Sequence, residues 1–399
     1  NSFRCLFIKV DMKKNNIIEK YNLPSEVIFC KRCVVSNQRP RISFDKEGIC
    51  SACRFSDHKN NGINWEKREN QLAQLCEKHR SLDGSYDVVV PSSGGKDSNY
   101  VAHMLKNKYN MHPLLVTWSP QVYTELGRKN LTSVIDSGFD SILITANGEV
   151  NRKLTKAAFI NMGDPHQSFI YGQFSAPFKV AIQYKIPLVF YGEDTEVEYG
   201  GSMEHADRSS LDYEVFTKHR FSSLSPSSFE QYGFKASDLE KYGLSEEEVK
   251  SIKELNIKQY FFGYFSKWIP QENVKCAIEH TGFRASEVRS EGTYSKDSSL
   301  DNLLDGFHYY LSYIKFGLGR CISDAAHEVR DGYMTRDEAI ALVKKYDGEF
   351  PIKYYQEFLD YCDITEEEFR EIIDSWRSHH IWKFEKNEWK LKNPIWLED

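Results

Sequence analysis

Between residues 86 and 191 the chain alternates short apolar, β-branched runs with longer amphipathic stretches. The short runs predict strands and the longer stretches predict helices, because strands are short while helices repeat apolar residues every three or four positions. This alternation predicts right-handed βαβ units and a parallel sheet covered on both faces, an α/β fold. The expected strands are residues 86–90, 113–118, 141–145, 186–191 and 259–265, and the expected helices between them are residues 98–107, 125–137 and 175–184.

Helical patterns dominate the rest of the chain. Residues 222–257 are Ser-rich and then rich in Glu and Lys, with Ser237 and Ser245 as expected N-caps, and they predict a solvated helical insertion. After residue 300 nearly all the pattern is helical. The expected helices there are residues 301–315, 335–345, 352–361 and 365–378.

Length and charge narrow the class of protein. With 399 residues the chain can form more than one hydrophobic core. A net charge of -6 gives no overall attraction to a phosphate backbone, which makes nucleic acid an unlikely partner. No apolar run approaches the roughly 20 residues that cross a bilayer, so no membrane association is expected. Met12 followed by two lysines is typical of a natural start, so residues 1–11 are expected to precede the native chain.

Two Cys-x-x-Cys pairs, Cys30 with Cys33 and Cys50 with Cys53, stand sixteen residues apart. This spacing is typical of a zinc ribbon, and a short hairpin between the pairs would bring all four thiols to one Zn²⁺ ion. Four thiolates fill a tetrahedral site, so the zinc is expected to be structural. Because these thiols must be reduced to bind metal, a cytoplasmic location is expected.

The stretch VVVPSSGGKDSNY, residues 88–100, runs from a strand through Gly94 and Gly95 into a helix. Glycines let the backbone approach a ligand closely, and a helix N-terminus attracts anions, so the stretch predicts a phosphate-binding loop. It matches neither the Walker A pattern nor the dinucleotide pattern Gly-x-Gly-x-x-Gly.

The six residues Ser93, Gly94, Gly95, Lys96, Asp97 and Ser98 resemble without a gap the signature of the PP-loop ATP pyrophosphatases, which adenylate a carbonyl group and release pyrophosphate. The resemblance implies ATP and Mg²⁺ as cofactors. It implies that the loop and Lys96 hold the β- and γ-phosphates and that Asp97 binds Mg²⁺, both acting as catalytic residues.

A second likeness to that group follows the expected strand 186–191. Gly192, Glu193 and Asp194 take the place of its acidic motif, which implies that Gly192 contacts ATP, Asp194 aids magnesium and Glu193 contacts ribose or substrate. Ligands in open α/β sheets bind beyond the carboxyl ends of strands, so the strand end Thr117-Trp118-Ser119 would flank adenine, with Thr117 as an expected ATP contact. The alternative is that the acidic residues only cap the next turn.

Several later motifs follow one another along the chain: Gly163-Asp164-Pro165-His166, Pro177-Phe178-Lys179, Glu198-Tyr199-Gly200-Gly201 and Lys315-Phe316-Gly317-Leu318-Gly319-Arg320. In this order they resemble the bacterial N-acetyl sugar amidotransferases of surface-polysaccharide biosynthesis, including that of lipopolysaccharide O-antigen. The resemblance covers roughly residues 28–396. It implies that ATP activates the acetamido oxygen of a nucleotide-linked N-acetyl sugar and that ammonia then displaces AMP to leave an acetamidino group.

The resemblance also implies a partner and further site residues. No glutaminase nucleophile is recognisable in the chain, so a separate glutamine amidotransferase subunit is expected to supply ammonia. Lys315 and Arg320 are expected to be catalytic, although a helix dipole would also explain them. The expected substrate-binding residues are Glu193, Glu198, Tyr199, His166 and Arg289. For His166 the alternative is a plain hydrogen-bonding role, and for Arg289 it is a place in a solvated loop.

These motifs divide the chain into an N-terminal tail (1–24), a zinc ribbon (25–60), a PP-loop ATPase core (61–285) and a helical region (286–399). Two other functions stay open at this point. One is a tRNA-modifying PP-loop enzyme for thiolation or amination, which the acidic balance disfavours. The other is a non-enzymatic zinc-ribbon interaction protein, against which the intact loop at residues 93–98 argues.

Overall fold

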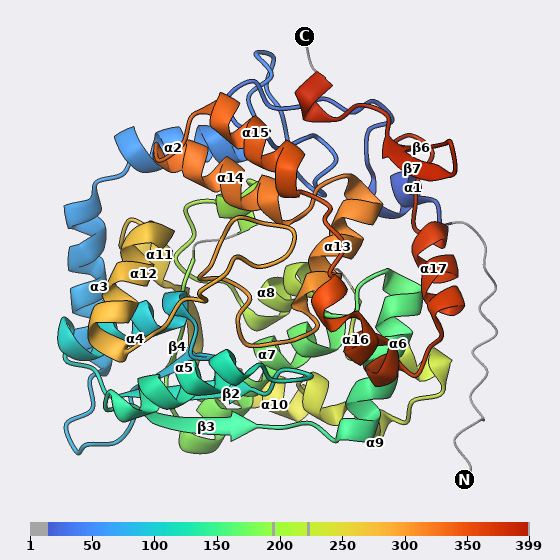
Figure 1. The fold of residues 1–399 in the computed structure, drawn as a ribbon. Coiled ribbons are helices and arrows are strands. Elements are labelled where there is room, and N and C mark those ends of the chain that lie inside the picture. Colours follow the sequence, from blue (N-terminus) through green and yellow to red (C-terminus); the bar gives the residue numbers. More distant parts are fainter. Residues whose placement is uncertain (1–14, 194–195, 222–223, 398–399) are drawn as a thin grey trace.

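A five-stranded parallel sheet is the frame of the described part of the chain (Figure 1). The structure is a computed structural model that describes residues 15–193, 196–221 and 224–397. Every strand pairs in parallel with its neighbour, in the order β3-β2-β1-β4-β5, so the predicted α/β class and parallel sheet are confirmed. The strands are β1 (Val88–Pro91), β2 (Pro113–Trp118), β3 (Asp140–Ile144), β4 (Leu188–Tyr191) and β5 (Lys258–Phe261).

The order of the strands reverses at β1. The chain moves outward from β1 to β2 and β3, then crosses back so that β4 lies on the other side of β1. Loops that leave β1 and β4 therefore turn away from each other and open a crevice at the carboxyl ends of these strands. In open α/β sheets ligands bind at such a crevice.

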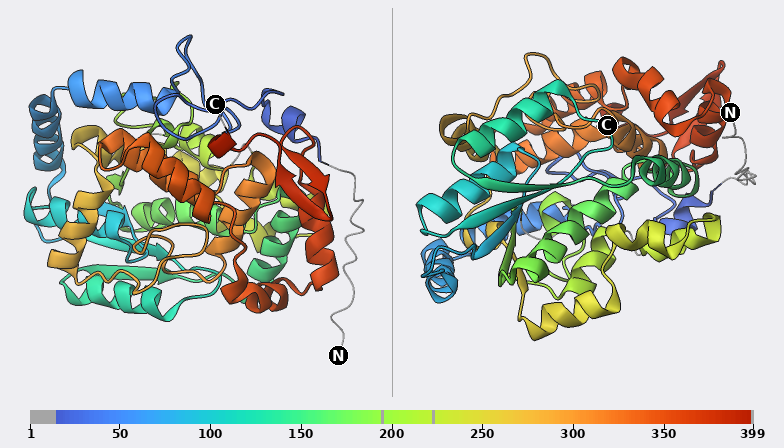
Figure 2. Two further views of the ribbon diagram at one scale, coloured as in Figure 1. Left: turned by 45° about the horizontal axis from the view of Figure 1, so that its top comes forward. Right: turned by 90° about the horizontal axis from the view of Figure 1, so that it is seen from below.

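Helices cover both faces of the sheet, because successive residues of a strand point to opposite sides. Val88 and Val90 of β1 pack in one core, whereas Val89 packs in another on the opposite face. Figure 2 shows helices on both sides of the sheet. The helices of the Val88 face are α3 (Trp65–His79), α4 (Lys96–Asn107), α5 (Glu125–Asp136), α11 (Phe262–Phe265) and α12 (Pro270–Thr281), and those of the Val89 face are α6 (Gly148–Met162), α7 (Gln167–Tyr184) and α8 (Tyr213–Arg220).

Two elements of this core differ from the sequence prediction. The strand expected at residues 259–265 ends at Phe261, and the chain turns at once into α11, where Phe262 and Phe265 are both buried. A helix buries residues three apart, whereas a strand would point them to opposite faces. Helix α6 was not predicted, and α7 begins eight residues earlier than expected, at Gln167.

The described part of the expected insertion, residues 224–257, is helical as predicted, but it is not simply solvated. Phe229, Leu239 and Tyr242 are buried in the core under α7, so the prediction of a solvated segment is wrong for these side chains. Ser245 forms the predicted capping box with Glu248, whereas the expected cap Ser237 lies inside a helix. The elements are η2 (Pro226–Tyr232), α9 (Ala236–Leu239), η3 (Glu240–Tyr242) and α10 (Glu246–Glu254).

The two ends of the chain share a third core. Cys30 and Cys53 from the cysteine-rich segment pack with Leu311 and Trp376 from the C-terminal helices. The described N-terminal elements there are α1 (Ile17–Tyr21) and α2 (Ser51–Asn61), and the C-terminal ones are α13 (Asp305–Phe316), α14 (Arg320–Asp331), α15 (Arg336–Tyr346), η4 (Ile352–Tyr354), α16 (Tyr355–Cys362), α17 (Glu366–Ser375), β6 (Trp382–Glu385), β7 (Glu388–Leu391) and η5 (Ile395–Leu397). The hairpin β6–β7 and helix α14 were not predicted.

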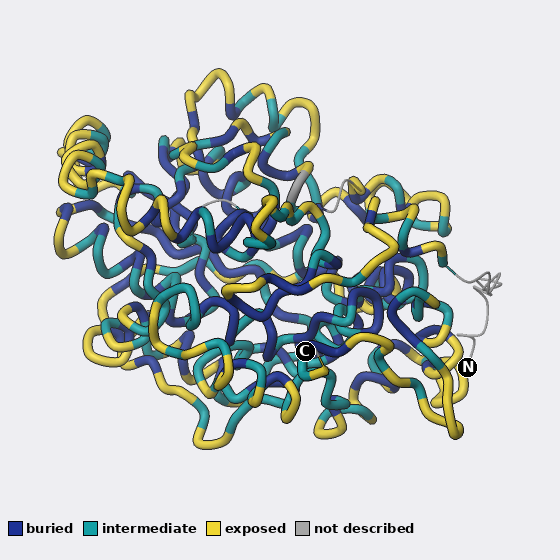
Figure 3. Tube along the Cα trace, turned by 90° about the horizontal axis from the view of Figure 1, so that it is seen from above, coloured by how far each residue is buried: buried dark blue, intermediate teal, exposed yellow. Residues whose placement is uncertain are grey.

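Buried residues run through the whole molecule, while exposed residues concentrate in peripheral loops and on outer helix faces (Figure 3). The cysteine-rich segment and the C-terminal helices share one core, and the sheet has a further core on each face. None of the helices that the structure describes is long and apolar enough to cross a membrane.

Helix α7 approaches the sheet closely at Gly172. A Cβ atom added there would lie 1.9 Å from the ring of Trp118 on β2. We expect Gly172→Ala to lower the free energy of unfolding by roughly 1–3 kcal/mol, because the ring must move within a packed core. Chemical denaturation would measure the change. Gln183→Ala, exposed on the same helix, should stay within about 0.5 kcal/mol of the parent, and equal stability of the two variants would contradict this packing.

Candidate functional site

The glycine-rich loop lies between β1 and α4, at the crevice of the sheet. Gly94 has a φ of +83°, and a Cβ there would lie 2.6 Å from the backbone nitrogen of Leu131 on α5. Gly95 differs, since a Cβ there would meet only the Ser93 hydroxyl oxygen, at 3.6 Å. The fold itself therefore requires glycine at position 94. At position 95 the space in front of the backbone is open, as a ligand that approaches the loop would need.

The N-terminus of α4 faces the same space. Gly95 is its N-cap residue and no side chain among the described residues caps it. The Ser98 hydroxyl donates to the Gly95 carbonyl oxygen (3.0 Å) and lies 3.0 Å from the Ser92 hydroxyl, which accepts from the Gly94 amide. The first N–H groups of a helix lack intrahelical partners, so this end of α4 fits an anion such as phosphate.

Asp97 lies on the first turn of α4 between two donors. Its Oδ2 is 2.6 Å from the ammonium nitrogen of Lys96, and its Oδ1 accepts from the Asn273 amide at 3.0 Å. Lys96 is buried, whereas the Asp97 side chain remains 36% exposed and lines a cavity. A carboxylate that is held but still accessible fits a Mg²⁺ ligand.

That cavity, of about 250 Å³, is called the phosphate-loop cavity below. Ser93, Gly95, Asp97 and Ser98 form its polar side, and Gly192 and Glu193 close it after β4. Its other side is apolar. That side is formed by Val116, Trp118, Phe169, Phe174 and Tyr191.

Thr117, expected to flank adenine, is buried and points away from the phosphate-loop cavity. Its hydroxyl donates to the Ser92 carbonyl oxygen, while its neighbours Val116 and Trp118 line the cavity. Because the side-chain period of a strand is two, the neighbours reach the cavity when Thr117 does not. Asp194, expected to bind magnesium, lies outside the described residues.

A larger cavity, of about 780 Å³, is called the basic cavity. Arg220, at the end of α8, lines both it and the phosphate-loop cavity, so the two adjoin. Tyr199 lines the basic cavity, and burial, followed by Glu193 and Asp97, raises the pKa of its phenol well above the usual value. Its basic lining residues are Lys20, Arg39, Arg41, Arg220 and Lys315.

Acidic and imidazole side chains meet between α6 and α13. Asp164 Oδ1 lies 2.8 Å from Nδ1 of His308, and His166 Nδ1 lies 3.3 Å from Asp305. Burial lowers the pKa of His166 to about 4, with His308 adding to this effect. Burial alone would raise the pKa of Asp164, but His308 and Lys315 lower it overall. His166 is thus held neutral at physiological pH.

Arg320 lies at the first turn of α14, where Asp324 fixes it through a bond of 2.8 Å. It also donates to the Tyr309 hydroxyl group, and its charge influences Lys96 of the loop. The start of the helix is held by Asp347, which accepts from the amides of Gly319 (2.9 Å) and Ile322 (3.0 Å). Arg320 is therefore fixed on the side of the molecule that faces the loop.

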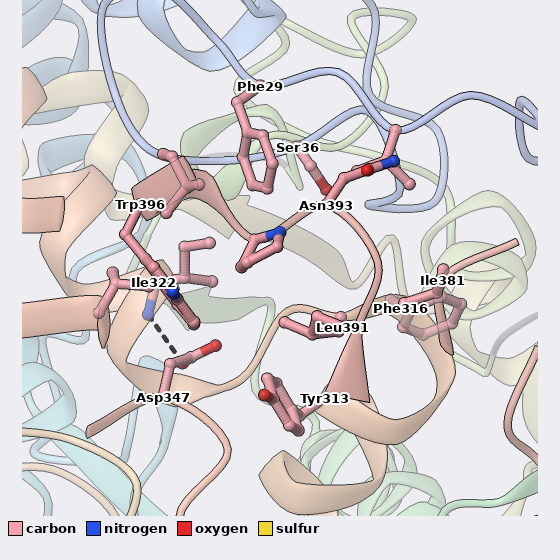
Figure 4. A pocket seen from close by; sticks show the side chains of 15 residues that line it. Phe29, Ser36, Tyr313, Phe316, Ile322, Asp347, Ile381, Leu391, Asn393 and Trp396 are labelled. Atoms are coloured by element: carbon pink, nitrogen blue, oxygen red, sulfur yellow. Dashed lines mark hydrogen bonds between the residues drawn. The ribbon is translucent and has the colours of Figure 1, made fainter. Parts of the chain in front are cut away.

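Beside Asp347 lies a small apolar cavity of about 20 Å³ (Figure 4). Figure 4 shows Phe29 from the cysteine-rich segment, Tyr313 from α13 and Trp396 from the C-terminal segment around it. A cavity of that size has room for about one water molecule. It is a packing gap between the two ends of the chain, and not a substrate site. Burial raises the pKa of Asp347 to about 7, although the Gly319 and Ile322 amides lower it in part.

Two residues expected to bind substrate are instead held in ion pairs. Glu198 is 3% exposed and lies 2.5 Å from Lys59 of α2 and 3.0 Å from His327 of α14. Burial opposes ionisation, but Lys59 and His327 lower the pKa of Glu198 to about 2. Arg289 makes two bonds to Glu349, of 2.6 and 2.8 Å. Both placements favour a structural role.

The four cysteines of the two pairs come together and are fully buried. The Cys30 and Cys53 sulfurs are 3.9 Å apart and those of Cys33 and Cys50 are 3.7 Å apart. A tetrahedral ion with metal–sulfur bonds of about 2.3 Å needs sulfurs about 3.8 Å apart. The cluster therefore fits a metal such as zinc. The expected hairpin is reduced to an isolated bridge between Phe44 and Cys50.

The cysteine-rich segment also reaches the basic cavity. Arg39 and Arg41, between the two pairs, line it, and Arg41 lies 2.8 Å from Glu196. The Ser51 hydroxyl donates to the carbonyl oxygen of Gly201 at 3.3 Å. A metal in the cluster would thus hold two arginines in place against the turn after β4.

Sequence reasoning missed several residues of these cavities. Lys20, Arg39 and Arg220 belong to no motif, and Tyr191 could have been found only from the alternation of its strand. Trp118 lies in the strand end that was expected to flank adenine, and it lines the phosphate-loop cavity.

Comparison with protein families concerns the C-terminal part of the chain. Residues 281–395 match the family described as "LPS biosynthesis protein WbpG-like, C-terminal domain". The match supports a role in lipopolysaccharide biosynthesis. It includes Lys315 and Arg320, which come from α13 and α14. Comparison with curated proteins finds no match.

The loop glycines allow a matched test. We expect Gly95→Ala to weaken ATP binding roughly tenfold or more, because the methyl group fills the space before the α4 N-terminus, while stability stays within about 0.5 kcal/mol. Gly94→Ala should instead destabilise the protein by roughly 1–3 kcal/mol, since it combines a positive φ with a backbone clash. Isothermal titration calorimetry and denaturation would measure both. Unchanged ATP affinity in Gly95→Ala would contradict a phosphate site here.

The cysteine cluster makes a separate prediction. Cys33→Ser removes one of four thiolates, so we expect zinc content, measured by elemental mass spectrometry, to fall well below about one ion per chain. The melting temperature should fall with it. Cys76→Ala, which alters a buried cysteine of α3 outside the cluster, should retain its zinc. Full zinc occupancy in Cys33→Ser would contradict a four-cysteine site.

Proposed function

We propose that the protein is an ATP-dependent amidotransferase of lipopolysaccharide biosynthesis that acts on a nucleotide-linked N-acetyl sugar. The observation that carries the proposal is the pairing of the two cavities. A loop with an open glycine and an uncapped helix N-terminus lines one of them, and Arg220 lines both. A phosphate donor and a second substrate could therefore meet at this boundary.

In the proposed reaction the acetamido oxygen of the sugar attacks the α-phosphorus of ATP. An O–P bond forms, the bond to the β-phosphate oxygen breaks, and pyrophosphate leaves. Ammonia then adds to the activated carbon, AMP leaves with the former amide oxygen, and an acetamidinium group remains. Adenylation is needed because an amide oxygen is otherwise a poor leaving group.

The residues around the loop have distinct proposed tasks. The α4 N–H groups, with Ser93 and Ser98, would bind the β- and γ-phosphates, and Lys96 would exchange its bond with Asp97 for one to phosphate. Asp97 would then be free to bind Mg²⁺, which supplies charge neutralisation for the leaving group. The apolar side of the phosphate-loop cavity, with Trp118 and Tyr191, suits a purine ring.

Arg320 would stabilise negative charge that develops near the loop. Its guanidinium group is held by Asp324 and Tyr309, so its orientation is fixed before substrate binds. Preorganised charge of this kind stabilises a transition state without further reorganisation.

Ammonia has a proposed external source. The described cysteines outside the cluster, Cys76, Cys276, Cys321 and Cys362, lie on helices, and burial raises the pKa of each thiol. Cys76, Cys321 and Cys362 are also buried, whereas Cys276 is partly exposed. A thiol that stays protonated is a poor nucleophile for glutamine hydrolysis. We therefore propose that a separate glutamine amidotransferase supplies ammonia, and that free ammonium can replace it in vitro.

Pyrophosphate release tests the proposal. The protein would be incubated with ATP, Mg²⁺ and ammonium together with a panel of nucleotide-linked N-acetyl sugars, or with tRNA in a parallel arm. We expect release that depends on one of the sugars. Asp97→Asn should lower the rate roughly 10²–10³-fold, the usual cost of removing one preorganised charge, with an unchanged melting temperature. Asp136→Asn, an exposed change on α5, should retain the parent rate.

Two outcomes would contradict the proposed function. Release that requires tRNA would assign the protein to nucleic-acid modification instead. Release that occurs equally with and without every acceptor, or full activity in Asp97→Asn, would remove the proposed chemistry from this loop.

A further inference from the structure

The basic cavity has an unusual balance of charge. Five cationic side chains line it, and its two carboxylates are already engaged. Glu196 lies 2.8 Å from Arg41, and Asp164 lies 2.8 Å from His308. Within the described residues, no carboxylate lies within 4 Å of the charged groups of the other four cations, which are Lys20, Arg39, Arg220 and Lys315.

Lys315 is the least expected of these cations, because it is 6% exposed. The hydrogen bond recorded for its ammonium group runs to the carbonyl oxygen of Met162, at 3.3 Å, and the rings of Tyr21, Phe316 and Trp376 surround it at 5.3–5.9 Å. Burial of an ammonium group without a carboxylate costs free energy that these contacts only partly offset. A bound anion would offset the remainder.

The other cations of the basic cavity increase the free-energy cost of burying the Lys315 ammonium group. Desolvation, together with the charge of Lys315, lowers the pKa of Lys20 to about 8. Burial lowers the pKa of Arg39 to about 10, with Arg330 and Arg41 adding to the effect. The positively charged side chains of the basic cavity therefore repel one another. A ligand of opposite charge that binds there would remove this repulsion.

The other residues that line the basic cavity indicate which kind of negatively charged ligand fits it. Tyr199, Tyr309 and Phe216 provide flat surfaces for a base or a sugar ring, and about 780 Å³ exceeds the needs of a simple inorganic ion. Arg220 connects this space to the phosphate-loop cavity. A long ligand with a negatively charged group at its centre could therefore reach from the basic cavity to the phosphate-loop cavity.

We propose that the basic cavity binds the diphosphate group of a nucleoside diphosphate sugar through Lys20, Arg39 and Lys315, with the sugar directed toward Arg220 and the phosphate loop. This assignment rests on the proposed function for the identity of the second substrate. The diphosphate site itself stands on the unpartnered cations and the shape of the cavity.

The test is binding without ATP or Mg²⁺, measured by isothermal titration calorimetry on the full chain. UDP, GDP, CDP and dTDP are the probes, each compared with its uncharged nucleoside and with inorganic pyrophosphate. We expect at least one nucleoside diphosphate to bind at least about tenfold more tightly than its nucleoside and than pyrophosphate. Lys315→Met and Arg39→Gln should each weaken that binding about tenfold to 100-fold, the usual effect of losing a hydrogen bond to a charged group. Lys344→Met, an exposed change on α15, should leave it unchanged.

Stability distinguishes a binding role from a structural one. Removal of a buried cation that has no carboxylate partner should leave the melting temperature of Lys315→Met unchanged or raised. If Lys315 only supported the fold, the melting temperature would fall and nucleoside diphosphate affinity would stay the same. That result would overturn the proposal, as would pyrophosphate binding as tightly as every nucleoside diphosphate, which would assign the cations to the phosphates of ATP.

Failure of the proposed reaction is distinguishable from failure of this site. Asp97→Asn should retain nucleoside diphosphate binding, because Asp97 lies in the other cavity. If nucleoside diphosphates bind in a Lys315-dependent way and yet no sugar supports pyrophosphate release, the site stands and the proposed reaction fails. If a sugar supports pyrophosphate release and Lys315→Met alters neither binding nor the KM for that sugar, the reaction stands and the site fails.

Discussion

The packing of the cysteine-rich segment and the C-terminal helices against the turn after β4 depends on one buried carboxylate, that of Glu198. It accepts charge-assisted contacts from Lys59 in the cysteine-rich segment and from His327 in the C-terminal helices, and it lies on the turn after strand β4. Three parts of the chain that are distant in sequence therefore meet at a single negative charge. Loss of Lys59 would break a buried ion pair, which typically costs about 3–5 kcal/mol. The ion pairs of Glu198 therefore hold its neighbour Tyr199, which lines the basic cavity, in a fixed place relative to α2 and α14.

The cysteine cluster has a related effect at longer range. Its sulfurs hold a segment that has little regular secondary structure before α2, and that segment carries Arg39 and Arg41 to the cavity wall. Arg330 of α14 lies close enough to the cluster for the thiols of Cys33, Cys53 and Cys50 to raise its pKa against the effect of burial. Arg330 also adds to the lowering of the pKa of Arg39, so the cysteine cluster and the basic cavity are electrostatically linked through this residue.

Sequence reasoning succeeded where a feature is local. The strands β1 and β2, the Ser245 capping box and the gathering of four cysteines follow from patterns within about twenty residues, and the structure contains all of them. It failed where a role depends on a partner elsewhere in the chain. Nothing near Glu198 in sequence indicates Lys59 or His327, so a buried ion pair had the same pattern as a substrate ligand.

The cavities were also difficult to predict, because residues that are distant in sequence line them. The motif at residues 93–98 located the glycine-rich loop, but only Lys315 of the basic cavity lies in a motif, because Lys20, Arg39, Arg220 and Lys315 come from four separate segments. Helix α6 and the hairpin β6–β7 were missed for another reason. The burial of α6 follows from tertiary packing, and most of the hairpin is not buried, so periodicity in one short window encodes neither element.

The origin of those four cations also has a consequence for how the protein is made. A ribosome synthesises Lys20 and Arg39 before Arg220, and Arg220 before Lys315. Contacts between residues so far apart in sequence form slowly, because long stretches of chain must be ordered before they are made. All five strands of the sheet around the glycine-rich loop precede residue 262, whereas the lining of the basic cavity is incomplete until Lys315 has been made. A nascent chain that ends before Lys315 would thus contain the glycine-rich loop without the complete basic cavity beside it.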